Sequence, residues 1–140
     1  MSVDYSYAIT PFLAWLVAGA IKFLINSIKA KQLAFELIGY GGLPSNHSAI
    51  SSSIAALIAF KEGIGHPAFG VALTLAFIVA LDAHSLRKQV GKHAVAINLL
   101  AASSKSHQTL RERMGHSRIE IATGIAVGIA VAAAVSKACN

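Results

Sequence analysis

The sequence GGLPSNHSAISSSIAALIAF, residues 41–60, joins a turn signature to an uninterrupted apolar and serine-rich run. Pro44 fixes its own φ, and Ser45 belongs to the residue types favoured at the N-cap of a helix. The run that follows contains no proline or glycine, so it predicts a helix from about Ser45 to Phe60. This helix would be short for a membrane span, which needs about 20 predominantly apolar residues.

The chain on either side of this stretch is unusually apolar. Of its 140 residues, 55% are hydrophobic and only 13% are charged, and the mean hydropathy is +0.62. Water-soluble domains usually carry about 25% charged residues. We therefore expect an all-α integral membrane helical bundle that forms a single domain over residues 1–140.

Further apolar runs cover about Ala8–Ile28, Pro67–Ala83 and Ile119–Val135. The shorter stretch His93–Ala102 cannot cross a hydrocarbon core of about 30 Å at about 1.5 Å per residue. The sequence thus predicts about four spanning helices plus a short interfacial helix. A bundle this small could need a second copy of the chain, a homo-oligomer, to cover a polar site.

Two predicted loops carry five of the twelve basic residues that give the chain its net charge of +6. Lys29 and Lys31 follow the first span, and Arg87, Lys88 and Lys92 follow the third, so two crossings place both groups on one side. The positive-inside rule makes that side cytoplasmic, in an inner or plasma membrane. If His93–Ala102 does not cross, His116 opens on the same side. Basic residues without interleaved aromatic residues do not favour nucleic acid as a partner.

The loop before the helix at Ser45 has features of an anion site. Gly41 and Gly42 permit unusual backbone angles, and the N–H groups at Ser45 and Asn46 open a helix whose dipole favours negative charge. His47 would lie in the first turn, where it could donate a proton. The alternative is a plain helix entry with a surface histidine.

A second histidine motif is Gly115-His116-Ser117-Arg118-Ile119-Glu120. His116 and Glu120 stand at i and i+4 and would face each other if the helix begins near His116. A carboxylate on one imidazole nitrogen leaves the other free to attack an electrophile. A solvated pair at a helix start is the alternative. Gly124 and Gly128 continue the face of Glu120 and predict close helix packing.

Charged residues also interrupt the apolar pattern at two other places. Asp82 ends the third apolar run, where an ionisable group usually has a partner or a task. Arg87 and Lys88 follow it, and an arginine can bind phosphate oxygens in a bidentate fork. Lys22 lies inside the first apolar run and is either a snorkelling lysine or a phosphate ligand. Basic anchoring at the membrane surface is the alternative for Arg87 and Lys88.

Six histidines raise the question of a metal. No His-x-x-x-His spacing occurs, and no acidic cluster supplies oxygen ligands. We expect no metal and no cofactor.

Taken together, these motifs resemble the divergent relatives of the type 2 phosphatidic acid phosphatase and vanadium haloperoxidase superfamily, over about Lys22 to Gly128. Pro44-Ser45-Asn46-His47 is similar to the Pro-Ser-Gly-His motif of the broad superfamily. His116-Ser117-Arg118-Ile119-Glu120 is similar to its His-x-x-x-Asp. The divergent branch typically has Gly-Gly-Met-Pro-Ser-Ser-His-Ser-Ala, which residues 41–49 resemble with Leu43 and Asn46 substituted.

Other positions extend the resemblance. Residues 82–88 resemble the Asp-Ala-x-Gly-Val-Arg-Arg segment of the branch, Asn98 fits a later Leu-Asn position, and Lys22 fits a lysine late in the first helix. One position departs from the pattern. The superfamily has an arginine six residues before the nucleophilic histidine, where this chain has Leu110, and Arg111 stands one residue off.

The resemblance implies a metal-independent membrane phosphatase that works through a phosphohistidine. His116 would attack phosphorus, Glu120 would orient it, and His47 would protonate the leaving alkoxide. The residues implied to hold the phosphate oxygens are Lys22, Ser45, Asn46, Arg87 and Lys88. The substrate would be a phospholipid, with phosphatidylglycerophosphate first and phosphatidic acid next.

Other functions also fit the sequence. A non-catalytic membrane scaffold or anionic-lipid-binding protein would account for the apolar helices and the basic loops. An undecaprenyl (di)phosphate phosphatase is a further alternative. A vanadate-dependent haloperoxidase is disfavoured by composition, because such enzymes are usually soluble.

Overall fold

The computed structural model describes residues 4–31, 42–103 and 108–139, so Gly41 lies outside the described residues. The described chain is helical: α1 (Ser6–Ala30), α2 (Asn46–Lys61), α3 (Pro67–Leu81), the π-helical turn η2 (Asp82–Leu86), α4 (Arg87–Leu100) and α5 (Arg118–Ala138). This all-α architecture confirms the expected membrane helical bundle, and the three other predicted apolar runs coincide with α1, α3 and α5 to within a few residues.

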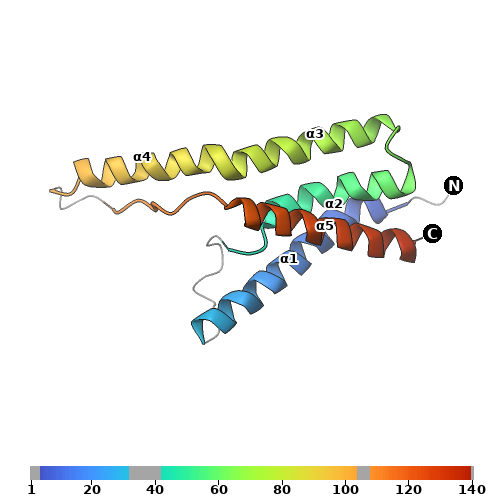
Figure 1. Ribbon diagram of the computed structural model, residues 1–140, viewed down its shortest axis with the longest axis horizontal. Coiled ribbons are helices and arrows are strands. Elements are labelled where there is room, and N and C mark those ends of the chain that lie inside the picture. Colours follow the sequence, from blue (N-terminus) through green and yellow to red (C-terminus); the bar gives the residue numbers. More distant parts are fainter. Residues whose placement is uncertain (1–3, 32–41, 104–107, 140) are drawn as a thin grey trace.

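α2 is the central helix, and it packs against α1, α3 and α5 (Figure 1). Its buried positions are mainly serine and alanine. α1 and α5 also meet their neighbours through small residues four positions apart. The buried residues are Ser6, Thr10, Ala14 and Ala18 on α1, and Gly124, Gly128, Ala132 and Ser136 on α5. Large apolar side chains such as Phe12, Trp15, Val71 and Phe77 are exposed instead. This arrangement suits a lipid environment, where helices associate through small residues.

The contact between α2 and α5 is especially close. A Cβ added at Gly128 would lie 2.2 Å from Ser52 Oγ and 2.5 Å from the carbonyl oxygen of Ala49. At Gly124 it would lie 2.4 Å from the carbonyl oxygen of Ser45. The two backbones therefore touch, as the glycine spacing predicted, and no side chain larger than hydrogen fits at either glycine.

The expected separate helix at His93–Ala102 is instead the far part of one continuous helix. α3, η2 and α4 form a helix of 34 residues over Pro67–Leu100, about 51 Å long at about 1.5 Å per residue. No proline interrupts residues 82–100, and the π-helical turn carries the helix through the charged residues that suggested a loop. Gly91 is accommodated because the chain packs on it there: an added Cβ would lie 2.5 Å from the carbonyl oxygen of Glu112.

The described residues contain three helices long and apolar enough to cross a membrane: α1, the helix Pro67–Leu100, and α5. α2 has 16 residues, about 24 Å, so the span predicted at Ser45–Phe60 is a short helix that packs against α1, α3 and α5. The starts of α2 and α5 lie at one end of the bundle, toward the C-terminal end of α1 and α4 (Figure 1). We call this the histidine end. The opposite end, with the turn at 62–66, is the turn end.

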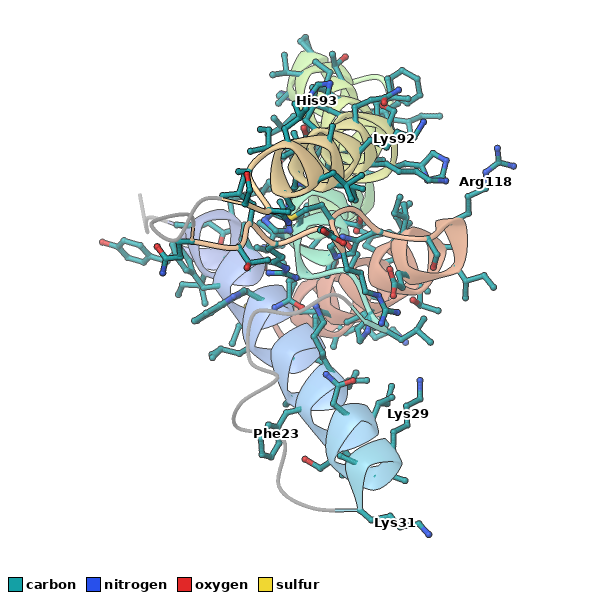
Figure 2. All side chains as sticks on the ribbon, turned by 90° about the vertical axis from the view of Figure 1, so that its left-hand side faces the viewer. Phe23, Lys29, Lys31, Lys92, His93 and Arg118 are labelled. Carbon is teal, nitrogen blue, oxygen red and sulfur yellow. The ribbon has the colours of Figure 1, made fainter. Side chains whose placement is uncertain are left out.

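The histidine end is strongly basic. Figure 2 views the molecule from this end, and the side chains of Lys29, Lys31, Lys92 and Arg118 point outward from it. This distribution agrees with the charge pattern of the sequence and with an integral membrane protein whose basic face meets anionic headgroups.

Candidate active site

The start of α2 is fixed to α5 by a buried serine. The Ser45 hydroxyl accepts from the backbone N–H of Ser48 and thus caps the helix, as predicted. The backbone N–H of Ser45 donates to the carbonyl oxygen of Glu120 at 2.8 Å. The expectation that the Ser45 backbone holds phosphate is therefore corrected, because that N–H group already has a partner. Ser45 is fully buried and structural.

Asn46, the first residue of α2, has an unsatisfied polar atom. Its Oδ1 is buried and has no hydrogen-bond partner among the described residues, while its Nδ2 lies near Gly19 of α1, 3.7 Å from where a Cβ would be. A buried polar atom without a partner is uncommon in native proteins and points to a bound water or ligand. An amide oxygen accepts hydrogen bonds, so this atom would take a donor. The expectation that Asn46 holds a phosphate oxygen would use its Nδ2 group and remains a proposal.

His116 is held by its backbone to the π-helical turn. Its N–H donates to the carbonyl oxygen of Ala83 at 2.8 Å, and its carbonyl oxygen lies 3.3 Å from Nδ1 of His84. The preceding Gly115 has φ +90°, and a Cβ there would lie 3.2 Å from the backbone nitrogen of Lys88. Both backbone polar groups of His116 are thus held from the η2 side.

The predicted pairing of His116 with Glu120 on one helix face is wrong in its geometry. α5 begins at Arg118 with Ser117 as its N-cap, so His116 precedes the helix. The Glu120 carboxylate accepts from the backbone N–H of Ser117 at 2.8 Å, and the Ser117 hydroxyl accepts from the N–H of Glu120 at 3.2 Å. This capping box is the stronger local use of the carboxylate. The motif Ser-x-x-Glu at 117–120 was the sequence signal for it.

The His116 ring consequently has an unpaired nitrogen. Its Nδ1 is buried without a hydrogen-bond partner in the described part of the chain. Glu120 acts on this imidazole through space and not by a direct hydrogen bond. The structure does not show Glu120 orienting the His116 ring by a hydrogen bond. That its charge assists His116 in catalysis remains a proposal.

The two histidines of the sequence motifs meet. The ring centroids of His47 and His116 are 6.3 Å apart, with the ring planes at 89°. They come from the starts of α2 and α5, which the Ser45–Glu120 hydrogen bond and the glycine contacts hold together. One phosphoryl group could contact both rings at this separation.

Two cations act on the histidine pair. Lys22 of α1 and Arg87 of α4 both act electrostatically on His47 and on His116. Arg87 Nε donates to Asp82 Oδ2 at 3.0 Å, a pairing across the π-helical turn, in which residues i and i+5 are neighbours. This contact gives Asp82 the partner that its position required. The terminal nitrogens of Arg87 make no hydrogen bond to the described residues and could take an anion.

Burial lowers the pKa of His116 below its ordinary value of 6.5. Glu120 opposes this shift, while Lys22, His47 and Arg87 add to it. The imidazole is therefore held neutral to a lower pH than a histidine in water. A neutral imidazole is the form that can act as a nucleophile.

Other candidate residues lie outside the immediate pair. Lys88 is exposed, and its backbone packs against Gly115. Asn98 holds the segment at 108–117, which precedes α5, to α4. Its amide donates to the carbonyl oxygen of Leu110 and accepts from the N–H of Leu110, each at 2.9 Å. Arg111 Nε donates to the carbonyl oxygen of Arg113 within its own segment. Gly42 has φ +144° and approaches Asn26 of α1.

His84 is the residue that sequence reasoning missed. Its only signal in the sequence is its place inside the Asp82–Lys88 motif. No group of three or more His, Cys, Asp or Glu side chains that could hold a metal ion occurs within residues 4–31, 42–103 and 108–139.

Comparison with known proteins identifies the family of the chain. The chain matches the family described as the Divergent PAP2 family over residues 4–131. It is 30% identical over 128 residues to the uncharacterized membrane protein YuiD of Bacillus subtilis (strain 168), covering 79% of this chain and 81% of that protein. No solved structure matches the chain. With both histidine motifs inside the matched region, the chain belongs to the Divergent PAP2 family.

Proposed function

We propose that this protein is a membrane lipid phosphatase that hydrolyses a phosphomonoester through a phosphohistidine. The observation that carries the proposal is the 6.3 Å approach of His47 and His116, on which the charges of Lys22 and Arg87 both act. Membership of the Divergent PAP2 family supports a phosphatase-related activity. The three long apolar helices support a substrate that resides in the membrane.

In the proposed reaction, an imidazole nitrogen of His116 attacks phosphorus and the bond from phosphorus to the alcohol oxygen breaks. His47 gives its proton to the departing alkoxide. Water then attacks the phosphohistidine, His47 takes a proton from that water, and the nitrogen–phosphorus bond breaks. Inorganic phosphate leaves, and both histidines return to their starting states.

The cations would contribute most of the rate. The transferred phosphoryl group spreads negative charge over its equatorial oxygens, so positioned positive groups stabilise the transition state. Lys22 and the free terminal nitrogens of Arg87 supply this charge, and Asn46 supplies a polar contact. Asp82 keeps Arg87 in place through Nε.

The substrate we favour is phosphatidylglycerophosphate, followed by phosphatidic acid. Both are phosphomonoesters with an anionic headgroup, which suits the basic histidine end. The positive-inside rule would place that end in the cytoplasm, where such lipids are made.

The test is phosphate release from detergent-solubilised lipid phosphomonoesters by wild type, His116→Ala and His47→Ala, with His93→Ala as an exposed histidine control. We expect His116→Ala to lose activity, His47→Ala to lose about 10²-fold or more in kcat, and His93→Ala to be unchanged. Acid quench of wild type should trap an acid-labile phosphoenzyme that His116→Ala lacks. Full activity in His116→Ala would exclude the mechanism.

The basic histidine end also supports a second candidate, a non-catalytic scaffold that binds anionic lipids. That function predicts binding of anionic vesicles, reduced when Lys29, Lys31 and Lys92 are neutralised, with no turnover by wild type. Rates of phosphate release from a panel of lipid phosphates that includes undecaprenyl (di)phosphate distinguish the candidate substrates.

A further inference from the structure

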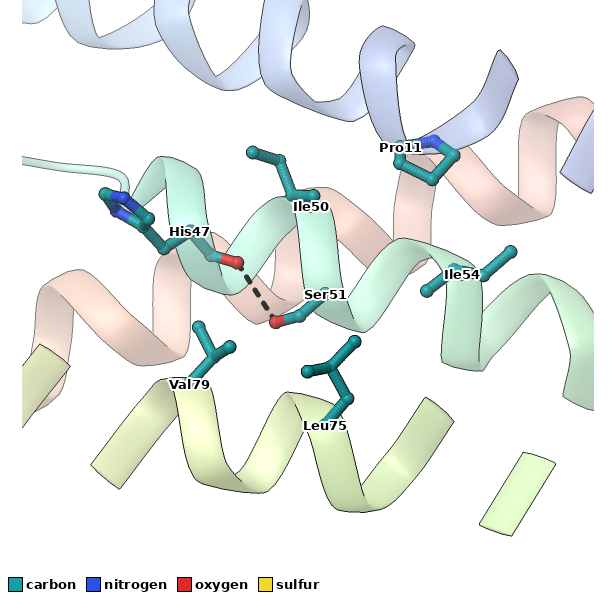
Figure 3. A pocket seen from close by; sticks show the side chains of 7 residues that line it. All are labelled: Pro11, His47, Ile50, Ser51, Ile54, Leu75 and Val79. Carbon is teal, nitrogen blue, oxygen red and sulfur yellow. Dashed lines mark hydrogen bonds between the residues drawn. The ribbon is translucent and has the colours of Figure 1, made fainter. Parts of the chain in front are cut away.

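An apolar groove leads along the membrane-facing side of α2 to His47. It has a volume of about 300 Å³, and α1 and α3 form its two walls while α2 forms its floor (Figure 3). The lining side chains include Pro11, His47, Ile50, Ile54, Leu75 and Val79.

The groove offers almost nothing polar except at its His47 end. Ser51 also lines it, but its hydroxyl donates to the carbonyl oxygen of His47 at 3.0 Å, as the dashed line in Figure 3 shows. A hydroxyl that bonds back to its own helix does not require a partner in the groove. The occupant is therefore apolar over most of its length and polar beside His47.

The groove suits a linear hydrocarbon chain. From His47 to Ile54 it follows α2 for about 10 Å at about 1.5 Å per residue, and its volume is about 300 Å³. A lipid whose phosphate lies beside His47 continues directly into this apolar space as a hydrocarbon chain, which is much narrower than an α-helix about 10 Å wide.

We propose that the groove holds one acyl chain of the lipid substrate, which enters sideways from the bilayer between α1 and α3. The inference rests on the proposed function, because the headgroup phosphate must lie at His47 and His116 while the tail lies in the groove. Acyl chains run roughly along the bilayer normal, and the groove runs along α2, one helix of the bundle. The protein would therefore recognise the acyl chain of its substrate as well as the phosphate.

α3 offers a matched pair of variants. Leu75 lines the groove and is 52% exposed, whereas Leu73 is 51% exposed on the same helix and does not line it. Leu75→Trp should fill the groove, while Leu73→Trp adds the same bulk to a lipid-facing surface. Both are assayed with a dipalmitoyl and a water-soluble dibutyryl lipid phosphomonoester of the same headgroup.

We expect Leu75→Trp to raise KM for the dipalmitoyl substrate by about tenfold or more, because several buried methylenes lose their contacts. The dibutyryl substrate should retain its wild-type kcat/KM, which also shows that the variant is folded. Leu73→Trp should match wild type with both substrates. Equal KM values for Leu75→Trp and Leu73→Trp with the dipalmitoyl substrate would overturn the inference.

A binding readout separates the two proposals. A lipid phosphomonoester with a photoreactive group midway along one acyl chain should cross-link His116→Ala protein at groove residues on α2 and α3. Cross-links there without turnover by wild type would reject the phosphatase and keep the groove. Turnover with cross-links spread evenly over the exposed faces of α1, α3 and α5 would reject the groove and keep the phosphatase.

Discussion

Both ends of the bundle contain paired polar side chains, but among the described residues only the histidine end also contains buried polar atoms without a partner. At the turn end, Lys61 Nζ lies 2.6 Å from Asp4 Oδ2, the Tyr7 hydroxyl donates to Glu62, and the His66 side chain caps α3. At the histidine end, Asn46 Oδ1 and His116 Nδ1 are buried without partners in the described chain. Polar groups that satisfy each other hold a fold together, whereas unsatisfied ones beside cations mark a place for a ligand.

The largest expected difference is between one cation from each end. Arg87→Met should lower kcat/KM by roughly a thousandfold, because it removes positive charge from the transferring phosphoryl group. Lys61→Met should leave kcat/KM within about twofold of wild type, because Lys61 pairs with Asp4 at the turn end and does not act on His47 or His116. Steady-state phosphate release measures both, and unchanged circular dichroism of each variant is the control. Equal losses of kcat/KM in the two variants would show that the catalytic site is not confined to the histidine end.

Two glycines with similar backbone angles test whether geometry matters more at the histidine end. Gly115 has φ +90° and Gly63 has φ +86°, but only Gly115 is close to other atoms. Alanine at either position should cost about 1–2 kcal/mol of stability from the left-handed conformation.

Only Gly115→Ala should also lower kcat, by about a hundredfold, because it displaces His116. Thermal unfolding in detergent and kcat for phosphate release provide the two readouts. A wild-type kcat in Gly115→Ala would show that the position of His116 tolerates this shift.

Two histidines give a smaller contrast. His84→Ala removes the contact to the carbonyl oxygen of His116, and we expect kcat to fall about tenfold, the scale of one hydrogen bond, with KM unchanged. His84→Asn, which keeps a donor, should recover most of the loss. His66→Ala removes a helix cap and should cost about 1 kcal/mol of stability without changing kcat. A raised KM with an unchanged kcat in His84→Ala would contradict the role of His84 in positioning His116.

The smallest effect concerns pH. Because burial lowers the pKa of His116, its neutral, nucleophilic form persists below pH 6.5, and the acid limb of kcat/KM should lie below that value. Lys22→Met removes one of the charges that lower this pKa, so the limb should move to higher pH. The Asp4 carboxyl at the turn end, whose pKa Lys61 lowers to about 2, stays ionised throughout that range.

Asp4 provides a pH control at the turn end. Its stabilising contact is fully present above its ordinary pKa of 3.8 and is lost as the pH falls through about 2. Asp4→Asn should therefore leave the acid limb of kcat/KM in place. If the acid limb moved in Asp4→Asn, the group that titrates in kcat/KM would lie at the turn end and would not be His116.

The sequence predicts much of this fold, and the reasons differ by residue. Apolar run lengths located α1, α3 and α5, and Ser45 located the start of α2. The i+4 spacing of Gly124 and Gly128 correctly predicted their contact, because helix periodicity alone decides which face they share. His47 and His116 were each recognised from their motifs, but their approach depends on tertiary packing.

Two features escaped sequence reasoning for physical reasons. The charged residues after Asp82 suggested a loop, but the helix continues because the i+5 geometry of the π-helical turn pairs Asp82 with Arg87. Glu120 was read as a partner of His116 because i+4 spacing assumes a helix that already includes both residues. The capping box moved the helix start past His116 and engaged the carboxylate.

The direct backbone contact at Gly124 and Gly128 has a consequence for the response of the site to its membrane. A bilayer that thickens or thins is accommodated by tilting of the helices that face it. α2 and α5 have no side-chain layer between them at these glycines, so they tilt as one body. His47 lies in the first turn of α2 and His116 lies two residues before α5, so the part of their separation that these two helices set is insulated from lipid composition. The hydrogen bond from His116 to Ala83 links the same site to the helix Pro67–Leu100, through which a tilt of that helix would reach His116.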